Sequence, residues 1–374
     1  MYCCVNLEMV RCFVMMGAGG RAMKGLILSG GTGSRLRPLT YTGAKQLIPV
    51  GNKPILFYAI EALRDSGVND IAIIVGDTRA EIRAAVGDGA AFGVRITYIE
   101  QERPLGLAHA VKIAQGFLGD DSFIMFLGDN LVRDGVDAFV RQFRSSSPAA
   151  LVLLSEVPEP QHFGVVELED GRVKRLVEKP KIPPSNLALV GVYLFQSEIF
   201  RAVSAISPSA RGELEITDAI QWLVDNGHTV EPHLIRGWWK DTGRPDDVLD
   251  ANRLMLEALE RDVRGDVDEH SHVVGRVQIG AGTRVVRSTL RGPIVIGDGV
   301  VIEDAYIGPF TSISDRVKIY GTEIENSVVL EESHIESAYR LDGSLIGRRV
   351  QIVPAVNKPK AIHLVLGDDS RCEF

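Results

Sequence analysis

The sequence has few cysteines, and their positions exclude several classes of protein. Only four occur in 374 residues: Cys3, Cys4 and Cys12 lie near the beginning and Cys372 lies near the end. This distribution fits neither the disulfide framework of a small secreted domain nor a CxxC metal site. We therefore expect a cytoplasmic protein.

Excess positive charge and long apolar runs are also lacking. The formal net charge is −8, from 49 acidic and 41 basic residues, and there is no long basic run. A surface for nucleic acid or for an anionic membrane is therefore not expected. No apolar run approaches the roughly 20 residues that a membrane span needs. With 45% hydrophobic and 24% charged residues, the composition is that of a globular protein long enough for two domains.

The first 22 residues need separate treatment. They contain an apolar patch and end in small residues, as a signal peptide does, but Glu8 stands where positive charge should be. We predict that residues 1–22 are a disordered or mis-assigned extension and that the fold begins at Met23.

The following part of the chain alternates apolar runs with amphipathic stretches, which predicts an α/β domain with a mostly parallel sheet. Thr78 and Glu81 have the spacing of a capping box at the start of one helix. Ligands of such sheets bind at the carboxyl ends of the strands. The expected strands are 24–30, 70–77, 95–101 and 122–130, and the expected helices are 52–67, 78–89 and 106–119.

The rest of the chain shows two different sequence patterns. A hairpin is expected over 163–180, followed by helices around 212–227 and 246–263. Beyond Gly265 an aliphatic residue followed by glycine recurs at steps near six, which is typical of a parallel β-helix. An antiparallel sandwich of short strands is the alternative. The final residues, 361–374, are expected to form a closing strand with a polar cap.

The loop after the first strand points to a phosphate ligand. Gly30, Gly31 and Gly33 let the backbone approach a ligand closely, and their spacing fits neither a dinucleotide fingerprint nor a P-loop. Arg35, Arg37 and Lys45 follow within a few residues. Guanidinium groups bind phosphate oxygens in a bidentate manner, so the loop is interpreted as a triphosphate or pyrophosphate cradle. A solvated loop with water-facing arginines is the alternative.

At this point the chain resembles a known family. GGTGSRLRPLT with KQLIPVGNKPILFYAI resembles the signature of the sugar-phosphate nucleotidyltransferases, most closely the long-form glucose-1-phosphate thymidylyltransferases. The likeness continues through GLAHA, FLGDN, FGVVE, VEKP, RGELEITD and WWKDTG. It implies a Rossmann-like domain over 23–262, with a mixed, mostly parallel sheet and helices on both faces. A left-handed parallel β-helix with a C-terminal cap would follow over 263–374.

The resemblance also implies roles for individual residues. Asp129 and Asp241 would hold Mg²⁺, which prefers oxygen ligands. Asp129 would act in catalysis together with the cations Arg35, Lys45 and Lys179. The residues expected to bind dTTP and glucose 1-phosphate are Gly30, Gly31, Gly33, Gln46, Gln101, Gly106, Gly164, Glu178 and Arg211. A family tyrosine is replaced by Phe163 here. An acidic residue at a strand end is equally often a turn former, so the residues alone leave these roles open.

Other functions stay open as well. Lys45-Gln46-Leu47 favours the thymidylyl enzymes over uridylyl and adenylyl relatives, but UTP or another hexose 1-phosphate is an alternative. His334 is the candidate base if the β-helix transfers acyl groups. A non-catalytic subunit that senses sugar nucleotides is a third possibility. By analogy with deoxysugar pathways, including antibiotic ones, the coils are expected to support a homo-oligomer or regulation.

Overall fold

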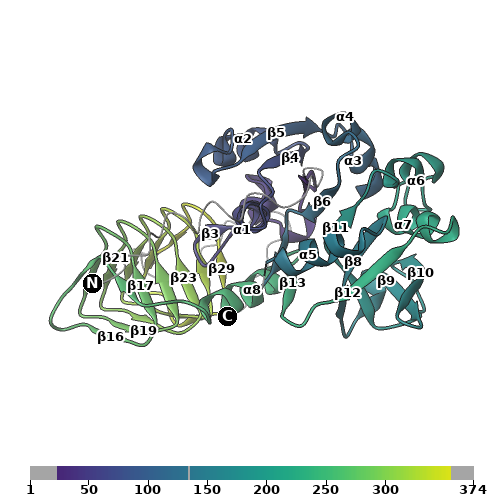
Figure 1. The fold of residues 1–374 in the computed structure, drawn as a ribbon. Helices are drawn as coiled ribbons and strands as arrows, with labels where there is room; N and C mark the ends of the chain where they lie inside the picture. The colour runs from purple at the N-terminus through teal and green to yellow at the C-terminus, as the bar shows by residue number, and fades with distance from the viewer. Residues whose placement is uncertain (1–22, 134, 355–374) are drawn as a thin grey trace, which may run out of the picture.

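The computed structural model describes residues 23–133 and 135–354. The extension predicted over 1–22 and the closing strand and cap predicted over 361–374 lie outside the described residues. Two bodies are visible, an α/β body and a tapering stack of coils beside it (Figure 1). Within the described residues, no helix combines the length and the apolar character needed to cross a bilayer.

The α/β body is built on a nine-stranded mixed sheet. Its path runs β10-β9-β11-β6-β1-β4-β5, with β8 pairing β11 and β12 beside it. The strands β6, β1, β4 and β5 are parallel to one another, and β11 runs antiparallel to β6. The strands are β1 (Lys24–Ser29), β4 (Asp70–Val75), β5 (Arg95–Glu100), β6 (Phe123–Leu127), β8 (Ala150–Glu156), β9 (Gly164–Glu169), β10 (Arg172–Glu178), β11 (Leu187–Phe195) and β12 (Val230–Leu234).

Helices cover both faces of this sheet, because the side chains of each strand alternate between the two. Leu26 of β1 packs into one core with α3, α4, α6 and α7. Its neighbour Ile27 packs into the other core with α1, α2 and α5. The helices are α1 (Ile55–Asp65), α2 (Arg79–Val86), α3 (Leu107–Ile113), α4 (Gln115–Leu118), α5 (Asp137–Ser146), α6 (Ile199–Ala205), α7 (Ile216–Asp225) and α8 (Pro245–Leu256).

Two pairs of short strands lie off the main sheet. One joins β2 (Pro49–Val50) to β3 (Lys53–Pro54), and the other joins β7 (Asn130–Val132) to β13 (Trp239–Asp241). The second pair aligns Asp241 with Asn130, the residue after Asp129. It therefore brings together two segments that are far apart in the sequence.

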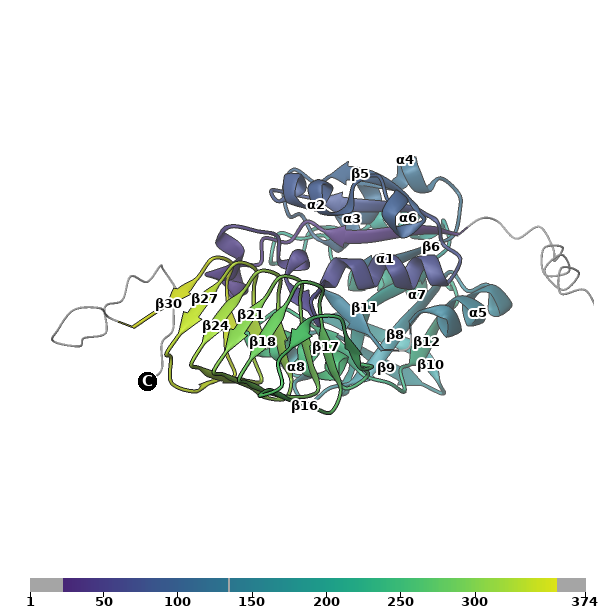
Figure 2. The same cartoon turned by 90° about the vertical axis from the view of Figure 1, so that its left-hand side faces the viewer.

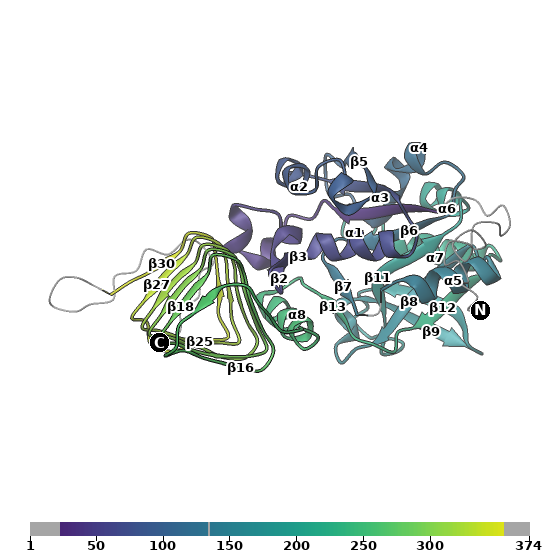
Figure 3. The same ribbon diagram turned by 60° about the vertical axis from the view of Figure 1, so that its left-hand side comes forward.

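The coils form a left-handed parallel β-helix with three flat sheets and a triangular cross-section (Figure 3). All of its strand pairs are parallel, which excludes the antiparallel sandwich. Inside, aliphatic side chains such as Ile279, Ile296 and Ile313 stack from coil to coil.

The strands of the coils fall into three sheets, each running from coil to coil. The sheets are β14 (Asp262–Val263), β17 (Val277–Ile279), β20 (Ile294–Ile296), β23 (Thr311–Ile313), β26 (Val328–Val329) and β29 (Leu345–Ile346); β15 (Asp266–Val267), β18 (Arg284–Val286), β21 (Val301–Glu303), β24 (Lys318–Tyr320), β27 (His334–Glu336) and β30 (Gln351–Ile352); and β16 (His272–Val274), β19 (Thr289–Arg291), β22 (Tyr306–Ile307), β25 (Glu323–Glu325) and β28 (Leu341–Asp342).

One sheet of the β-helix docks on the α/β body. Helix α8 lies beside the coils (Figures 2 and 3) and contacts the sheet that contains β23 and β29. The turn between β2 and β3 contacts the same sheet. Asn52 donates a hydrogen bond from Nδ2 to the carbonyl of Ile313 (2.7 Å). Asn252 of α8, which is fully buried, donates to the carbonyl of Phe310 (3.0 Å). The two bodies therefore share a packed interface.

Three details of the sequence-based description are wrong. The single helix predicted over 106–119 is divided at Ala114 into α3 and α4. The predicted capping box fails, because Thr78 makes no side-chain cap hydrogen bond at the start of α2. Helix α8 ends at Leu256, several residues before the predicted end at 263, and β14 begins at Asp262. The predicted hairpin is confirmed, with Asp170 and Gly171 at positive φ in its turn.

Candidate active site

The glycine-rich loop leaves the carboxyl end of β1 and folds back over Lys45. A β-carbon added at Gly31 would lie 3.1 Å from Lys45 Cε, and one at Gly33 would lie 3.0 Å from Lys45 Cβ. Gly33 also has φ 66° at the start of the short 3₁₀ helix η1 (Ser34–Leu36). The glycines are therefore needed for close packing of the lysine and for the turn itself.

Lys45 meets the carboxylate that ends β6. Its Nζ forms an ion pair and hydrogen bond with Asp129 Oδ2, and both side chains are largely buried. Asn130 Nδ2 donates to the other oxygen, Asp129 Oδ1 (3.0 Å). Burial by itself would raise the pKa of Asp129, but the charge and hydrogen bond of Lys45 and the bond from Asn130 lower it below the ordinary value.

The second predicted carboxylate lies in the same place. Burial, together with the negative charge of Asp129, raises the pKa of Asp241 to about 7, against the opposing charges of Lys45 and Arg35. A β-carbon added at Gly243 would lie 3.1 Å from Arg35 Nη2 and 3.3 Å from Asp241 Oδ2. Arg35, Lys45, Asp129 and Asp241 therefore form one cluster, although more than 200 residues separate them in sequence.

This cluster fits a hard divalent cation. Two neighbouring buried carboxylates repel each other when both are ionised, and a bound cation removes this repulsion. Mg²⁺ prefers oxygen ligands such as these. In the described part of the chain, no group of three or more His, Cys, Asp or Glu side chains could hold a metal ion. The remaining ligands would therefore have to be water and substrate oxygens.

The other predicted nucleotide contacts lie at the same edge of the sheet. Gln101, directly after β5, has Oε1 3.3 Å from the β-carbon position of Gly30. Its Nε2 donates to the carbonyl of Gly106 (3.3 Å). Gln46 is buried, and its Oε1 has no hydrogen-bond partner in the described structure. A buried oxygen without a partner is suited to receive a hydrogen bond from a ligand.

A separate group of predicted residues gathers around Glu178. The β-carbon position of Gly164 is 3.2 Å from Glu178 Oε2. Arg211 Nη1 donates to Glu178 Oε1 (3.3 Å), and Lys179 Nζ lies 3.7 Å from the same oxygen. Burial is the largest influence on Glu178 and raises its pKa, although Lys179 and Arg211 oppose it. The guanidinium carbon of Arg37 lies over the ring of Tyr41, 5.0 Å from the ring centroid.

Comparison with known proteins places this arrangement in a family. The model of the nucleotidyl transferase family matches residues 24–258. The chain belongs to the nucleotidyl transferase family. The prediction of a nucleotidyltransferase is thereby confirmed, and so is the α/β domain followed by a β-helix.

Individual relatives of this nucleotidyltransferase are similar over nearly their whole length. A glucose-1-phosphate thymidylyltransferase of Streptomyces antibioticus is 56% identical over 94% of this chain and 99% of its own. Another glucose-1-phosphate thymidylyltransferase, of Streptomyces griseus, is 53% identical over 94% of this chain and 99% of its own. A solved structure from Bacillus anthracis, assigned as a glucose-1-phosphate thymidylyltransferase, is 39% identical with a TM-score of 0.59, covering 62% of this chain and 95% of its own.

Three residues of the nucleotidyltransferase that hold Asp129 in place were missed by sequence reasoning. Asn130 donates to Asp129, and the indole Nε1 of Trp239 donates to Asn130 Oδ1 (2.5 Å). Thr242 donates to the carbonyl of Asp129 from both its amide (3.1 Å) and its hydroxyl (2.7 Å). All three stand in the quoted motifs FLGDN and WWKDTG, so the signal was present but unassigned.

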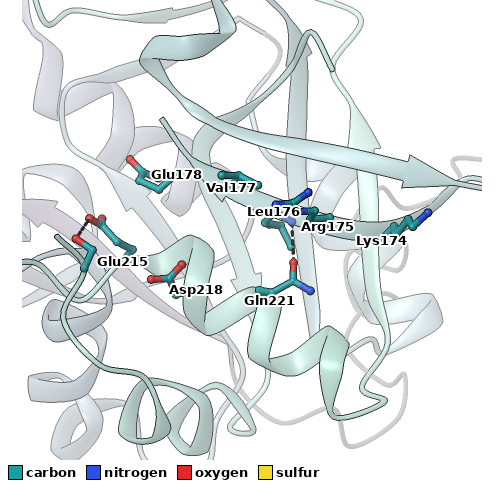
Figure 4. A pocket seen from close by; sticks show the side chains of 9 residues that line it. Lys174, Arg175, Leu176, Val177, Glu178, Glu215, Asp218 and Gln221 are labelled. Carbon is teal, nitrogen blue, oxygen red and sulfur yellow. Dashed lines mark hydrogen bonds between the residues drawn. The ribbon is translucent and has the colours of Figure 1, made fainter. Parts of the chain in front are cut away.

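A pocket of about 540 Å³ lies between β10 and α7, next to the residues predicted to bind the sugar (Figure 4). It is lined partly by acidic groups, including Glu178, Glu215 and Asp218, and burial raises the pKa of Asp218. Glu178 is its one lining residue among the predicted contacts. The pocket therefore adjoins the predicted site through Glu178 and shares no lining residue with the cluster of Arg35, Lys45, Asp129 and Asp241.

His334, the candidate base for acyl transfer, lies on β27 in the coils. Its ring is edge-on to Tyr320 (5.6 Å between centroids), and its Nε2 is 3.6 Å from Glu336 Oε2. Both neighbours belong to the β-helix, so the contacts of His334 fit a packed coil surface as well as a catalytic group.

Proposed function

We propose that this nucleotidyltransferase is a glucose-1-phosphate thymidylyltransferase. The observation that carries the proposal is the cluster of Asp129, Asp241, Lys45 and Arg35 at the carboxyl end of the sheet. The names of the relatives that match nearly the whole chain support the choice of substrates. In the same proposal, residues 23–262 are the catalytic domain and residues 263–374 are the β-helix.

The reaction needs no covalent intermediate. A phosphate oxygen of glucose 1-phosphate attacks the α-phosphorus of dTTP in line, and the bond from that phosphorus to the bridging oxygen breaks to release pyrophosphate. Gly30, Gly31 and Gly33 let the backbone approach the phosphates, while Arg35 and Lys45 offset the charge that shifts to the leaving group.

The proposed binding roles divide between nucleotide and sugar. Gln101 and Gly106 would face the base, and Gln46 the ribose. Glu178 would accept hydrogen bonds from sugar hydroxyls. The sugar and its phosphate would also meet Gly164, Lys179 and Arg211.

Asp129 and Asp241 would hold Mg²⁺, which supplies charge neutralisation at the phosphate oxygens when bound. Lys45 already occupies one oxygen of Asp129, so we expect it to move toward the phosphates as the cation arrives.

The test is pyrophosphate release from glucose 1-phosphate and Mg²⁺ with dTTP, UTP, ATP, CTP and GTP in turn. We expect a clear preference for dTTP. If none of the five nucleotides yields pyrophosphate, the proposal is refuted, and a sugar-nucleotide sensor or a scaffold becomes the better interpretation. Acetyl-CoA consumption with amino-sugar phosphates tests acyl transfer by the coils.

Replacement of the metal ligand gives the second arm of this test. Asp129→Ala should lower turnover by orders of magnitude and weaken Mg²⁺ binding measured by calorimetry. Asp121→Ala is the matched control, because Asp121 lies before the opposite end of β6 and pairs with Lys24 (3.0 Å). Turnover of Asp129→Ala equal to that of the control would contradict the assignment. The homo-oligomer implied by resemblance is tested by light scattering.

A further inference from the structure

A small apolar cluster contains residues that lie next to the proposed catalytic groups in the sequence. We call it the floor cluster, and its buried members come from four segments of the α/β body. These members are Leu36, Ile48, Val50, Ile55, Leu131, Val248 and Ala251.

Three of the four segments of the floor cluster also carry a group of the proposed site; the fourth is helix α8. Leu36 is the residue after Arg35, and Ile48 follows Lys45 by one turn of 3₁₀ helix η3 (Lys45–Leu47). Leu131 is two residues beyond Asp129. These side chains are at most 5% exposed, so their positions are held by packing. Small movements of the floor cluster would therefore also move the charged side chains that are on the same segments.

The β-helix packs against one side of the floor cluster. Leu345 of β29 packs against it, and so does Leu39 of the 3₁₀ helix η2 (Leu39–Tyr41). The β-carbon position of Gly347 is 3.5 Å from Leu39 Cδ2. Arg348 Nη1 lies 3.6 Å from the β-carbon position of Gly43. The last described coil thus contacts the segment that runs from Arg35 to Lys45.

The contacting coil is itself held firmly. Arg348 Nε donates to Glu331 Oε2 (2.6 Å) on the preceding coil. Val328 pairs with Leu345 and Val329 with Ile346 in a parallel ladder. The coil can therefore act as a rigid support, whereas the segment it touches consists of short 3₁₀ turns.

We propose that the β-helix positions the catalytic loop: Leu345, Gly347 and Arg348 hold residues 35–48 in the geometry needed for turnover. Leu345 is a positioning residue and touches no substrate. The inference rests on the proposed function for its kinetic readout only, because the order of the loop can be measured without any reaction.

The experiment compares two Leu→Ala variants of the full chain in the same coil. Leu345→Ala removes the side chain that faces the floor cluster. Leu341→Ala removes a partly buried leucine that packs into the core of the β-helix instead. We expect Leu345→Ala to lower kcat/KM for dTTP roughly tenfold. Amide hydrogen exchange in residues 34–48 should also become faster. Leu341→Ala should lower the melting temperature while leaving kcat/KM and that exchange unchanged.

A third variant guards against simple unfolding. Gly347→Leu keeps the core of the coil and pushes on Leu39, so it should reproduce the kinetic loss with a near-native melting temperature. The proposal is overturned if Leu345→Ala and Gly347→Leu match wild type in exchange over 34–48. If wild-type protein releases no pyrophosphate with any nucleotide, the proposed function fails, and the exchange data still decide this inference.

Discussion

Asn130 is the residue whose role is most sharply defined by its partners. The indole of Trp239 can only donate, so Asn130 must present Oδ1 to it and Nδ2 to Asp129. Asn130→Asp would place a second carboxylate against Asp129 Oδ1. We expect Mg²⁺ affinity, measured by calorimetry, to fall by a factor on the order of 10 to 100, as for other residues that orient metal ligands.

Two further variants test this chain of hydrogen bonds. Trp239→Phe should weaken Mg²⁺ binding less than Asn130→Asp, because the amide keeps its place but loses the bond that orients it. Asn226→Ala is the control, since Asn226 donates from its side chain to the carbonyl of Trp222 (2.8 Å) at the end of α7, far along the sequence from Asp129. Unchanged Mg²⁺ affinity in Asn130→Asp would refute the orienting role.

Glu178 predicts a dependence on pH at the sugar side. Burial raises its pKa, so the folded protein retains a proton above the pH at which an exposed glutamate loses it. The stability that this proton contributes is lost as the pH rises through the raised pKa. The same rise produces the carboxylate, which accepts hydrogen bonds from the sugar hydroxyls. We expect the KM for glucose 1-phosphate to fall as the pH rises above the range in which an exposed glutamate titrates.

The substrate phosphate also titrates near pH 6, so a reference variant is needed. Glu178→Gln cannot change charge, and the ratio of its KM to that of wild type isolates the carboxylate. We expect this ratio to grow with pH. A ratio that stays constant over the same rise in pH would show that Glu178 does not titrate there.

At the scale of elements, Gly106 joins two segments at the start of α3. It has φ 101°, and a β-carbon there would lie 2.4 Å from the carbonyl oxygen of Leu214. Leu214 also receives the amide of Ala108 and donates to Leu105. Gly106→Ala should therefore destabilise the protein by about 1–3 kcal/mol or more in denaturant unfolding. Gly116→Ala in α4, where nothing lies within 4 Å, should instead be neutral or stabilising. Equal effects would contradict the argument.

The regular elements were predictable because their periods are local. Alternating and helical apolar patterns gave the strands, the hairpin and the parallel coils. The capping box failed because Thr78 has ψ 23°, and this backbone differs from the extended one that lets a cap residue reach the helix amides. The glycines of the coils have a cause that the repeat alone could not reveal: a β-carbon at Gly297 would lie 2.3 Å from Asp315 Oδ1.

At the scale of the whole molecule, the resemblance supplied the predicted site residues but not the residues that support them. Asp129 and Asp241 are named by their motifs, whereas the contact of Leu345 with the floor cluster joins residues with no sequence pattern in common. The docked face was equally hidden, because one sheet of the β-helix buries polar Ser312 against α8. Polar residues at such positions are usually interpreted as solvent-facing.

Asn252 is the polar centre of that interface, and it predicts how the two bodies depend on each other. Its Oδ1 accepts from Gly51 N (2.9 Å) and Ser312 Oγ (2.6 Å). Its Nδ2 donates to Phe310. Asn252→Leu leaves these three groups, of which Ser312 is fully buried, without their partner and should cost about 2–4 kcal/mol in denaturant unfolding.

The reference for this loss is an amide at the exposed rim. Gln278 Nε2 donates to the carbonyl of Glu260 (3.1 Å), so Gln278→Ala should cost at most about 1 kcal/mol. Because Gly51 precedes the turn that Asn52 anchors to the coils, Asn252→Leu should also separate the unfolding of the β-helix from that of the α/β body. Fluorescence, which reports Trp222, Trp238 and Trp239 in the α/β body, and hydrogen exchange in the coils would then give different midpoints. A single midpoint equal to that of Gln278→Ala would show that Asn252 does not couple the two bodies.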